Sequence, residues 1–120
     1  MNYWDYINVP SLLQLQQGIA PPGQTPSKDE VLFIVSHQIH ELWFKLLLNE
    51  LASVRDVFRR NPVPDQHASA AVRSLRRCIT IFEVATHHWS VVETLTTRDY
   101  LAFRDQLIGA SGFQSSQLRE

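Results

Sequence analysis

Three residues at one-turn spacing are the first candidates for chemistry. Phe33, His37 and Glu41 are each four positions apart, so on a helix they share one face. A neutral imidazole beside an aromatic ring can accept a hydrogen bond from a ligand N–H while the ring packs on an apolar body. The alternative is a core histidine that bonds a backbone carbonyl or Glu41. Glu41 is also spaced to form an ion pair with Lys45.

A second candidate pair lies near the end of the chain. Tyr100 and Arg104 are four positions apart and would offer a phenol and a guanidinium side by side. A guanidinium binds a carboxylate through two parallel N–H bonds, and the phenol can add a third donor. The alternative is an arginine stacked over a tyrosine at the surface. Just after the pair, the small residues Gly109–Gly112 would let the backbone approach a flat ligand closely.

The histidines suggest a metal site only weakly. His37, His40 and Glu41 could face one ion, but zinc and di-iron helices use H-E-x-x-H, H-x-x-E-H or E-x-x-H, and these residues do not follow those orders. His87 and His88 are adjacent, so on a helix they point about 100° apart. The spacing therefore favours no metal ligands among these groups.

Capping signals place the elements that must position these residues. Ser27 and Glu30 form a capping box, in which the hydroxyl accepts the Glu30 N–H and the carboxylate reaches back to the cap. We expect a long helix from about 28 to 59, ended by the prolines of 61–64. Thr96 and Asp99 repeat the box and predict a short helix through roughly Leu107.

Between these lies a second long helix, expected from Asp65 to near Thr96. Its apolar residues recur at helical spacing on one stripe: Ala68, Val72, Leu75, Ile79, Phe82, Ala85 and Trp89. Near the start of the chain, Pro10 and Ser11 predict a short helix that closes before Gly18.

The class is therefore all-α, a helical bundle with two long helices, a short N-terminal helix and a short third helix. Both long helices carry apolar residues on more than one stripe, so other helices must cover them. These partners come from further copies of this chain or from sequence outside it.

Composition excludes several classes of protein. The chain has 120 residues, 44% of them hydrophobic, enough for one compact domain. Its 11 basic and 12 acidic residues produce no field that favours nucleic acid or anionic membrane. No apolar run approaches the roughly 20 residues of a membrane span. A single cysteine, Cys78, and a start without the layout of a signal peptide favour the cytoplasm.

Three stretches of the sequence, taken together, resemble the tryptophan 2,3-dioxygenase family. Residues 3–7 (Y-W-D-Y-I) are similar to its N-terminal Y-x-x-Y-[LI] segment, and residues 32–45 (L-F-I-V-S-H-Q-I-H-E-L-W-F-K) to its F-I-x-x-H-Q-x-x-E-L-W-x-K helix. Residues 103–105 (F-R-D) and 110–115 (A-S-G-F-Q-S) resemble its F-R-x-x-L-x-x-A-S-G-F-Q-S signature. Such spacing over about a hundred residues is far more specific than any single motif.

The resemblance implies a role for each matching residue. His37 would accept the indole N–H, Phe33 would pack on the indole, and Tyr100 with Arg104 would receive the substrate carboxylate. The heme pocket would be lined by Trp89, Leu107, Ser111 and Gly112. Three residues of the N-terminal arm would reach a neighbouring subunit's site in a homotetramer: Tyr3, Tyr6 and Ile7.

The implied reaction belongs to tryptophan catabolism in the kynurenine pathway. Dioxygen adds across the C2–C3 bond of L-tryptophan at a heme, iron protoporphyrin IX, and gives N-formylkynurenine. The family's proximal histidine lies in a C-terminal half outside these 120 residues, so the resemblance assigns no metal ligand here. Residues 1–120 would form one domain, with an N-terminal arm and loop at 1–26 and a helical core at 27–120.

Two departures leave alternatives open. His40 and Leu118 stand where the family pattern has other residue types. They are compatible with a divergent member that inserts one oxygen atom into a tryptophan derivative in secondary metabolism. A third possibility is a heme-free helical oligomer without catalysis.

Overall fold

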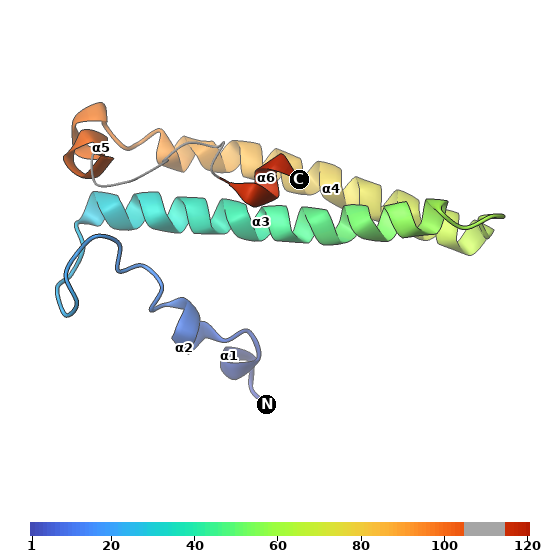
Figure 1. The fold of residues 1–120 in the computed structure, drawn as a ribbon, viewed down its shortest axis with the longest axis horizontal. Coiled ribbons are helices and arrows are strands. Elements are labelled where there is room, and N and C mark those ends of the chain that lie inside the picture. The colour runs from blue at the N-terminus through green and yellow to red at the C-terminus, as the bar shows by residue number, and fades with distance from the viewer. Residues whose placement is uncertain (105–114) are drawn as a thin grey trace.

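A computed structural model describes residues 1–104 and 115–120, and the all-α prediction is confirmed for these residues. They form six helices and no strand (Figure 1): α1 (Tyr3–Tyr6), α2 (Val9–Leu12), α3 (Lys28–Phe58), α4 (Asp65–Val92), α5 (Thr97–Arg104) and α6 (Ser116–Arg119). The long helices α3 and α4 lie side by side as an antiparallel hairpin, with α5 at one end and α6 near the middle.

Only one of the two hydrogen bonds of the predicted capping box forms at the start of α3. The Ser27 hydroxyl accepts the Glu30 N–H at 3.2 Å, as expected for an N-cap. The Glu30 carboxylate does not complete the predicted box, because it accepts the N–H of Ile19 at 2.7 Å. The predicted end near 59 is confirmed, since the helix ends at Phe58.

The predicted end of α4 near Thr96 is wrong. The helix ends at Val92, because Thr96 caps the start of the next helix, α5. Its hydroxyl accepts the Asp99 N–H at 3.2 Å and lies 2.6 Å from the Asp99 carboxylate. A residue that caps one helix has non-helical backbone, so a turn must separate α4 from α5. The expected end of α5, near Leu107, lies outside the described residues.

The N-terminal segment contains two short helices where one was predicted. The predicted helix is α2, which begins at Val9 and ends at Leu12. The additional helix, α1, is capped by Asn2, whose side chain accepts the Asp5 N–H at 2.8 Å. Asparagine three positions before an acidic residue is a signal that could have predicted this turn.

Small side chains bring α3 and α4 together. The buried residues of α4 are Ala71, Cys78, Ile81 and Ala85, and the central core cluster joins Cys78 and Ile81 to Leu47 of α3. Most of the predicted apolar stripe of α4 is not the face that packs against α3. Of its members only Ala85 is buried, whereas Val72, Leu75, Ile79, Phe82 and Trp89 are at least 39% exposed. The helix has two apolar sides, and the side with smaller residues faces α3.

One ion pair crosses the hairpin. Arg77 of α4 donates to the Glu50 carboxylate of α3 at 2.6 Å. Hydrogen bonds from Arg77 and Ser74 lower the pKa of Glu50 below its ordinary value. The pair therefore stabilises the fold above the ordinary pKa of glutamate, and this contribution is lost as the pH falls through the lowered value. Burial raises the pKa of the Cys78 thiol, which keeps it protonated and unreactive.

We expected no membrane span, because no apolar run approaches roughly 20 residues, yet one helix is a candidate by length and composition alone. The 31 residues of α3 are long and apolar enough to cross a membrane. The core helix of a soluble protein passes the same test, and α3 packs along α4 while carrying Glu41 and Lys45 within its length.

Candidate functional site

The structure brings three of the predicted site residues into one pocket. The ring centroids of Phe33 and His37 are 4.1 Å apart, and those of Phe33 and Tyr100 are 5.7 Å apart. They meet because α5 turns back onto the first turns of α3 (Figure 1). The pocket measures about 300 Å³ and is lined by Phe33, His37, Val92, Leu95, Thr96, Thr97 and Tyr100. This volume suits a small organic ligand.

The imidazole of His37 is fixed in one tautomer. Its Nδ1 lies 2.7 Å from the backbone carbonyl oxygen of Phe33, one turn earlier. A carbonyl only accepts, so Nδ1 must carry the proton, and in the neutral ring Nε2 keeps its lone pair. Within the described part of the chain, Nε2 has no hydrogen-bond partner. The backbone contact therefore leaves the Nε2 lone pair available to accept a hydrogen bond from a ligand.

Arg104 lies outside the pocket lining, at the face of Tyr100. Its guanidinium carbon is 5.8 Å from the centre of the Tyr100 ring, and the side chain is exposed. The stacked arrangement weighed as an alternative is thus present. It does not exclude a carboxylate receptor, because a stacked guanidinium keeps its N–H donors in the plane of the fork. No carboxylate of the described residues forms a salt bridge with Arg104.

Phe103 anchors this arrangement and was not predicted from the sequence. It is only 3% exposed, and its ring centroid is 5.3 Å from that of Phe33 and 5.7 Å from that of Tyr100. Edge-on contacts of this kind fix the relative orientation of rings. The available signal was its place three residues after Tyr100, on the neighbouring part of the same helix face.

Trp89 stands behind His37 on the α4 side. Their rings meet edge to face, with centroids 6.0 Å apart. Trp89 also stacks on His40, with the ring centroids 4.4 Å apart and an angle of 22° between the planes. His40 is 3% exposed, and its two ring nitrogens lie 2.8 Å and 3.0 Å from the carbonyl oxygens of Ser36 and Ala85. His40 thus connects α3 to α4 and supports Trp89.

Glu41 forms a different contact from the predicted ion pair. Its carboxylate accepts the amide of Gln117 at 2.7 Å, and the same amide donates to the Glu41 carbonyl at 2.9 Å. These bonds attach α6 to α3 one turn after His37. The expected pairing with Lys45 is not among the salt bridges of the described residues.

Other predicted site residues are not brought to this pocket. Tyr3 and Tyr6 of α1 are exposed, as is Ile7, and among the described elements α1 contacts only α2. The predicted heme-pocket residues Leu107, Ser111 and Gly112 lie outside the described residues, as does the remainder of the small-residue loop.

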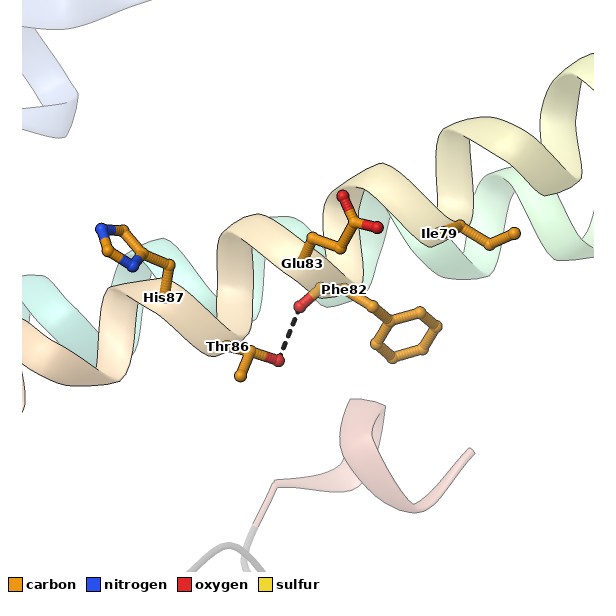
Figure 2. A pocket seen from close by; sticks show the side chains of 5 residues that line it. All are labelled: Ile79, Phe82, Glu83, Thr86 and His87. Carbon is orange, nitrogen blue, oxygen red and sulfur yellow. Dashed lines mark hydrogen bonds between the residues drawn. The ribbon is translucent and has the colours of Figure 1, made fainter.

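A second, wider hollow lies on the outer side of α4. It measures about 530 Å³ and is lined by Ile79, Phe82, Glu83, Thr86 and His87. Figure 2 shows that all five side chains leave one helix, and the only hydrogen bond among them joins the Thr86 hydroxyl to the Phe82 carbonyl. Because no second described element supplies an opposite wall, the hollow does not enclose a ligand.

The described residues contain no group of three or more histidine, cysteine, aspartate or glutamate side chains that could hold a metal ion. His40 has both ring nitrogens at backbone carbonyls. His67 lies against Arg60, with 2.6 Å between its Nδ1 and the guanidinium.

The cap of α5 can be tested directly, because it holds the Tyr100 side of the pocket. Thr96→Ala removes the acceptor of the Asp99 N–H and is expected to lower the free energy of unfolding by about 1 kcal/mol. Urea denaturation measures this loss. Thr80→Ala is the matched control, since the Thr80 hydroxyl donates to a carbonyl within α4 and caps nothing. Equal losses for the two threonines would contradict the assignment.

The described residues thus form a helical hairpin with a pocket of small-molecule size, partly walled by Phe33, His37 and Tyr100. The chain belongs to the tryptophan 2,3-dioxygenase family, since the family profile matches residues 1–120.

Relatives carry the same name in bacteria and animals. The tryptophan 2,3-dioxygenase of Sorangium cellulosum is 65% identical over 120 residues, which cover all of this chain and 29% of the relative. Tryptophan 2,3-dioxygenase 2 of Ralstonia nicotianae is 54% identical over 120 residues, all of this chain and 32% of the relative. The enzyme of Rattus norvegicus is 40% identical over 118 residues, 98% of this chain and 29% of the relative. The chain thus spans about a third of the length of these relatives.

Proposed function

We propose that the whole protein oxygenates the indole ring of L-tryptophan, adding dioxygen across C2–C3 at a bound heme to give N-formylkynurenine. The observation that carries the proposal is the His37 imidazole, whose Nδ1 is committed to the Phe33 carbonyl and whose Nε2 is left as an acceptor beside an aromatic wall. Family membership supports the same substrate, since relatives across bacteria and animals are named for it.

Three pocket residues, together with Arg104 beside Tyr100, would hold the substrate at three points. The His37 Nε2 accepts the indole N–H, and the Phe33 ring packs on the indole face. The Tyr100 hydroxyl and the Arg104 fork receive the carboxylate. Together these contacts fix the indole in one orientation, which is the protein's main contribution when a cofactor carries the reactive chemistry.

Heme fits the described residues only in part. Trp89 is 43% exposed and offers an aromatic wall next to His37. Both ring nitrogens of His40 lie at backbone carbonyl oxygens, so this histidine is not free to bind the iron. When bound, heme would supply the dioxygen chemistry, and the residue that binds its iron would come from outside the described residues. The residues described here bind and orient the substrate.

The same proposal includes a homotetramer in the cytoplasm. The exposed aromatic residues of α1 support an arm that acts on another subunit, since this helix contacts only α2 among the described elements. The free, buried thiol of Cys78 is compatible with a reducing compartment.

Spectroscopy and product analysis test this function in the full chain. We expect a Soret absorption band after heme supplementation, and a product heavier than tryptophan by two oxygen atoms. Absence of the band would reject the heme enzyme, and a gain of one oxygen atom would instead support the mono-oxygenating alternative.

The His37 contact has its own test. His37→Ala is expected to weaken tryptophan binding by about 1 kcal/mol, the net contribution of one neutral hydrogen bond. Equilibrium binding should show almost no loss for the benzothiophene analogue of tryptophan, in which sulfur replaces the indole N–H. A similar loss for both ligands would show that His37 acts through packing alone.

A further inference from the structure

The base of the N-terminal arm is held against α3 by a buried carboxylate. Glu30 is 6% exposed, and its Oε1 accepts the backbone N–H of Ile19 at 2.7 Å. Within the described part of the chain, Glu30 forms no salt bridge with a basic side chain. A buried polar group is costly unless it is hydrogen-bonded, and this one is bonded to the segment that leads into the arm.

Gly18 makes this contact possible. Its φ of +63° is a left-handed conformation that other residues rarely adopt. A Cβ at this position would overlap Glu30 Oε1 and lie 2.7 Å from Glu30 Cδ and 2.9 Å from Ile34 Cδ1. The backbone at residue 18 therefore approaches α3 as closely as only glycine permits.

Gln38 supplies a second attachment two turns further along α3. Its amide nitrogen donates to the Leu15 carbonyl at 2.9 Å, and its amide oxygen accepts the Gln16 side chain at 3.0 Å. Glu30 and Gln38 are eight positions apart on the helix, a span of about 12 Å. The segment 15–19 is thus fixed at both ends and runs antiparallel to α3.

The chain before this segment has no other support among the described residues. Helices α1 and α2 contact each other and no other described element, and they extend away from the hairpin (Figure 1). Tyr3, Tyr6 and Leu13 are 74%, 75% and 64% exposed. Helices α1 and α2 have four residues each and are too short to fix their own direction relative to the hairpin. That direction therefore follows from the attached segment 15–19.

We propose that Gly18, Glu30 and Gln38 are positioning residues that form a clamp. The clamp fixes the direction in which residues 1–14 leave the hairpin, so that the arm delivers its aromatic residues to the site that they complete. The arm's part in tryptophan binding rests on the proposed function, whereas the clamp itself rests on the contacts above.

The full heme-loaded chain serves for the test, with Glu30→Ala as the main variant. Hydrogen exchange of the Ile19 amide should accelerate about tenfold or more, because a bond to a charged acceptor is lost. Trypsin should also cleave the variant faster at Lys28 than the unsubstituted chain, which would be a second sign that the clamped segment has been released. The KM for tryptophan should rise severalfold, with kcat nearly unchanged.

Matched variants separate the clamp from a general loss of stability. Glu30→Gln keeps an oxygen acceptor and should recover most of the Ile19 protection and most of the KM. Gln38→Ala breaks the second attachment without touching the start of α3 and should also raise the KM. Glu83→Ala removes an exposed carboxylate from α4 and should change neither exchange nor KM.

Two results would overturn the proposal. Unchanged exchange at Ile19 in Glu30→Ala would mean that the carboxylate holds nothing. Faster exchange with an unchanged KM would mean that the clamp does not position the arm. If the unsubstituted chain failed to oxidise tryptophan, the proposed function would fall, while exchange and cleavage would still decide whether the clamp exists.

Discussion

Replacing Phe103 by alanine is expected to lower the free energy of unfolding by about 3–5 kcal/mol. The side chain is 3% exposed and packs edge-on against the rings of Phe33 and Tyr100. Its removal leaves a cavity between α5 and α3 and takes away the contact that orients these rings. Chemical denaturation of the full chain measures the loss, and tryptophan binding should weaken in parallel because Tyr100 and Arg104 belong to the same helix.

Phe103→Leu is the matched control, since it fills most of the volume and should cost less than about 1.5 kcal/mol. If binding weakens for leucine as much as for alanine, the aromatic edge itself orients the site. If alanine costs no more than about 0.5 kcal/mol, the site is not anchored by Phe103 and the assignment is wrong.

Arg104→Leu is expected to weaken tryptophan binding by about 1.5–3 kcal/mol, roughly tenfold to 150-fold, because a charge-assisted contact to the carboxylate is lost. Binding of indole, which lacks the carboxylate, should hardly change. Isothermal titration with both ligands measures the difference.

Two further arginine variants sharpen this result. Arg104→Lys keeps the charge but not the fork, so it should recover only part of the affinity. Arg98→Leu removes a charge from the same helix, away from the Tyr100 face, and should leave binding unchanged. Equal losses for tryptophan and indole in Arg104→Leu would refute a role in holding the carboxylate.

Local signals in the sequence predicted the elements well. Ser27 and Thr96 each cap the helix that their spacing indicated, because an N-cap depends on only a few neighbouring residues. The errors arose where a distant segment competes for a group. Glu30 was expected to complete its own cap, but its carboxylate binds Ile19 from the arm. Sequence spacing contains no information about that partner.

The orientation of α4 could not be predicted for a related reason. A stripe with large apolar residues looks like a core face, and here the face with Ala71, Cys78 and Ala85 packs against α3. Both faces have helical periodicity, and periodicity does not say which of two apolar faces meets which neighbour.

The candidate site was predicted in pieces. Spacing indicated that Phe33 and His37 share a face and that Tyr100 and Arg104 share another, and the resemblance suggested a common ligand. The structure adds the contact between the two pairs and the bond from His37 to the Phe33 carbonyl. Phe103, which joins the pairs, was missed because a buried phenylalanine has no chemical signature.

The large side chains on the outer face of α4 also bear on how the protein is made. Ile79 and Phe82 are 59% and 54% exposed in these 120 residues. In a chain as long as its relatives, with this stretch at the N-terminal end, the hairpin leaves the ribosome first. At about 5–20 residues per second, the remainder takes on the order of ten seconds or more to follow. During that interval the hairpin exposes an apolar surface that is prone to aggregation. We therefore expect nascent chains to bind chaperones until synthesis is complete.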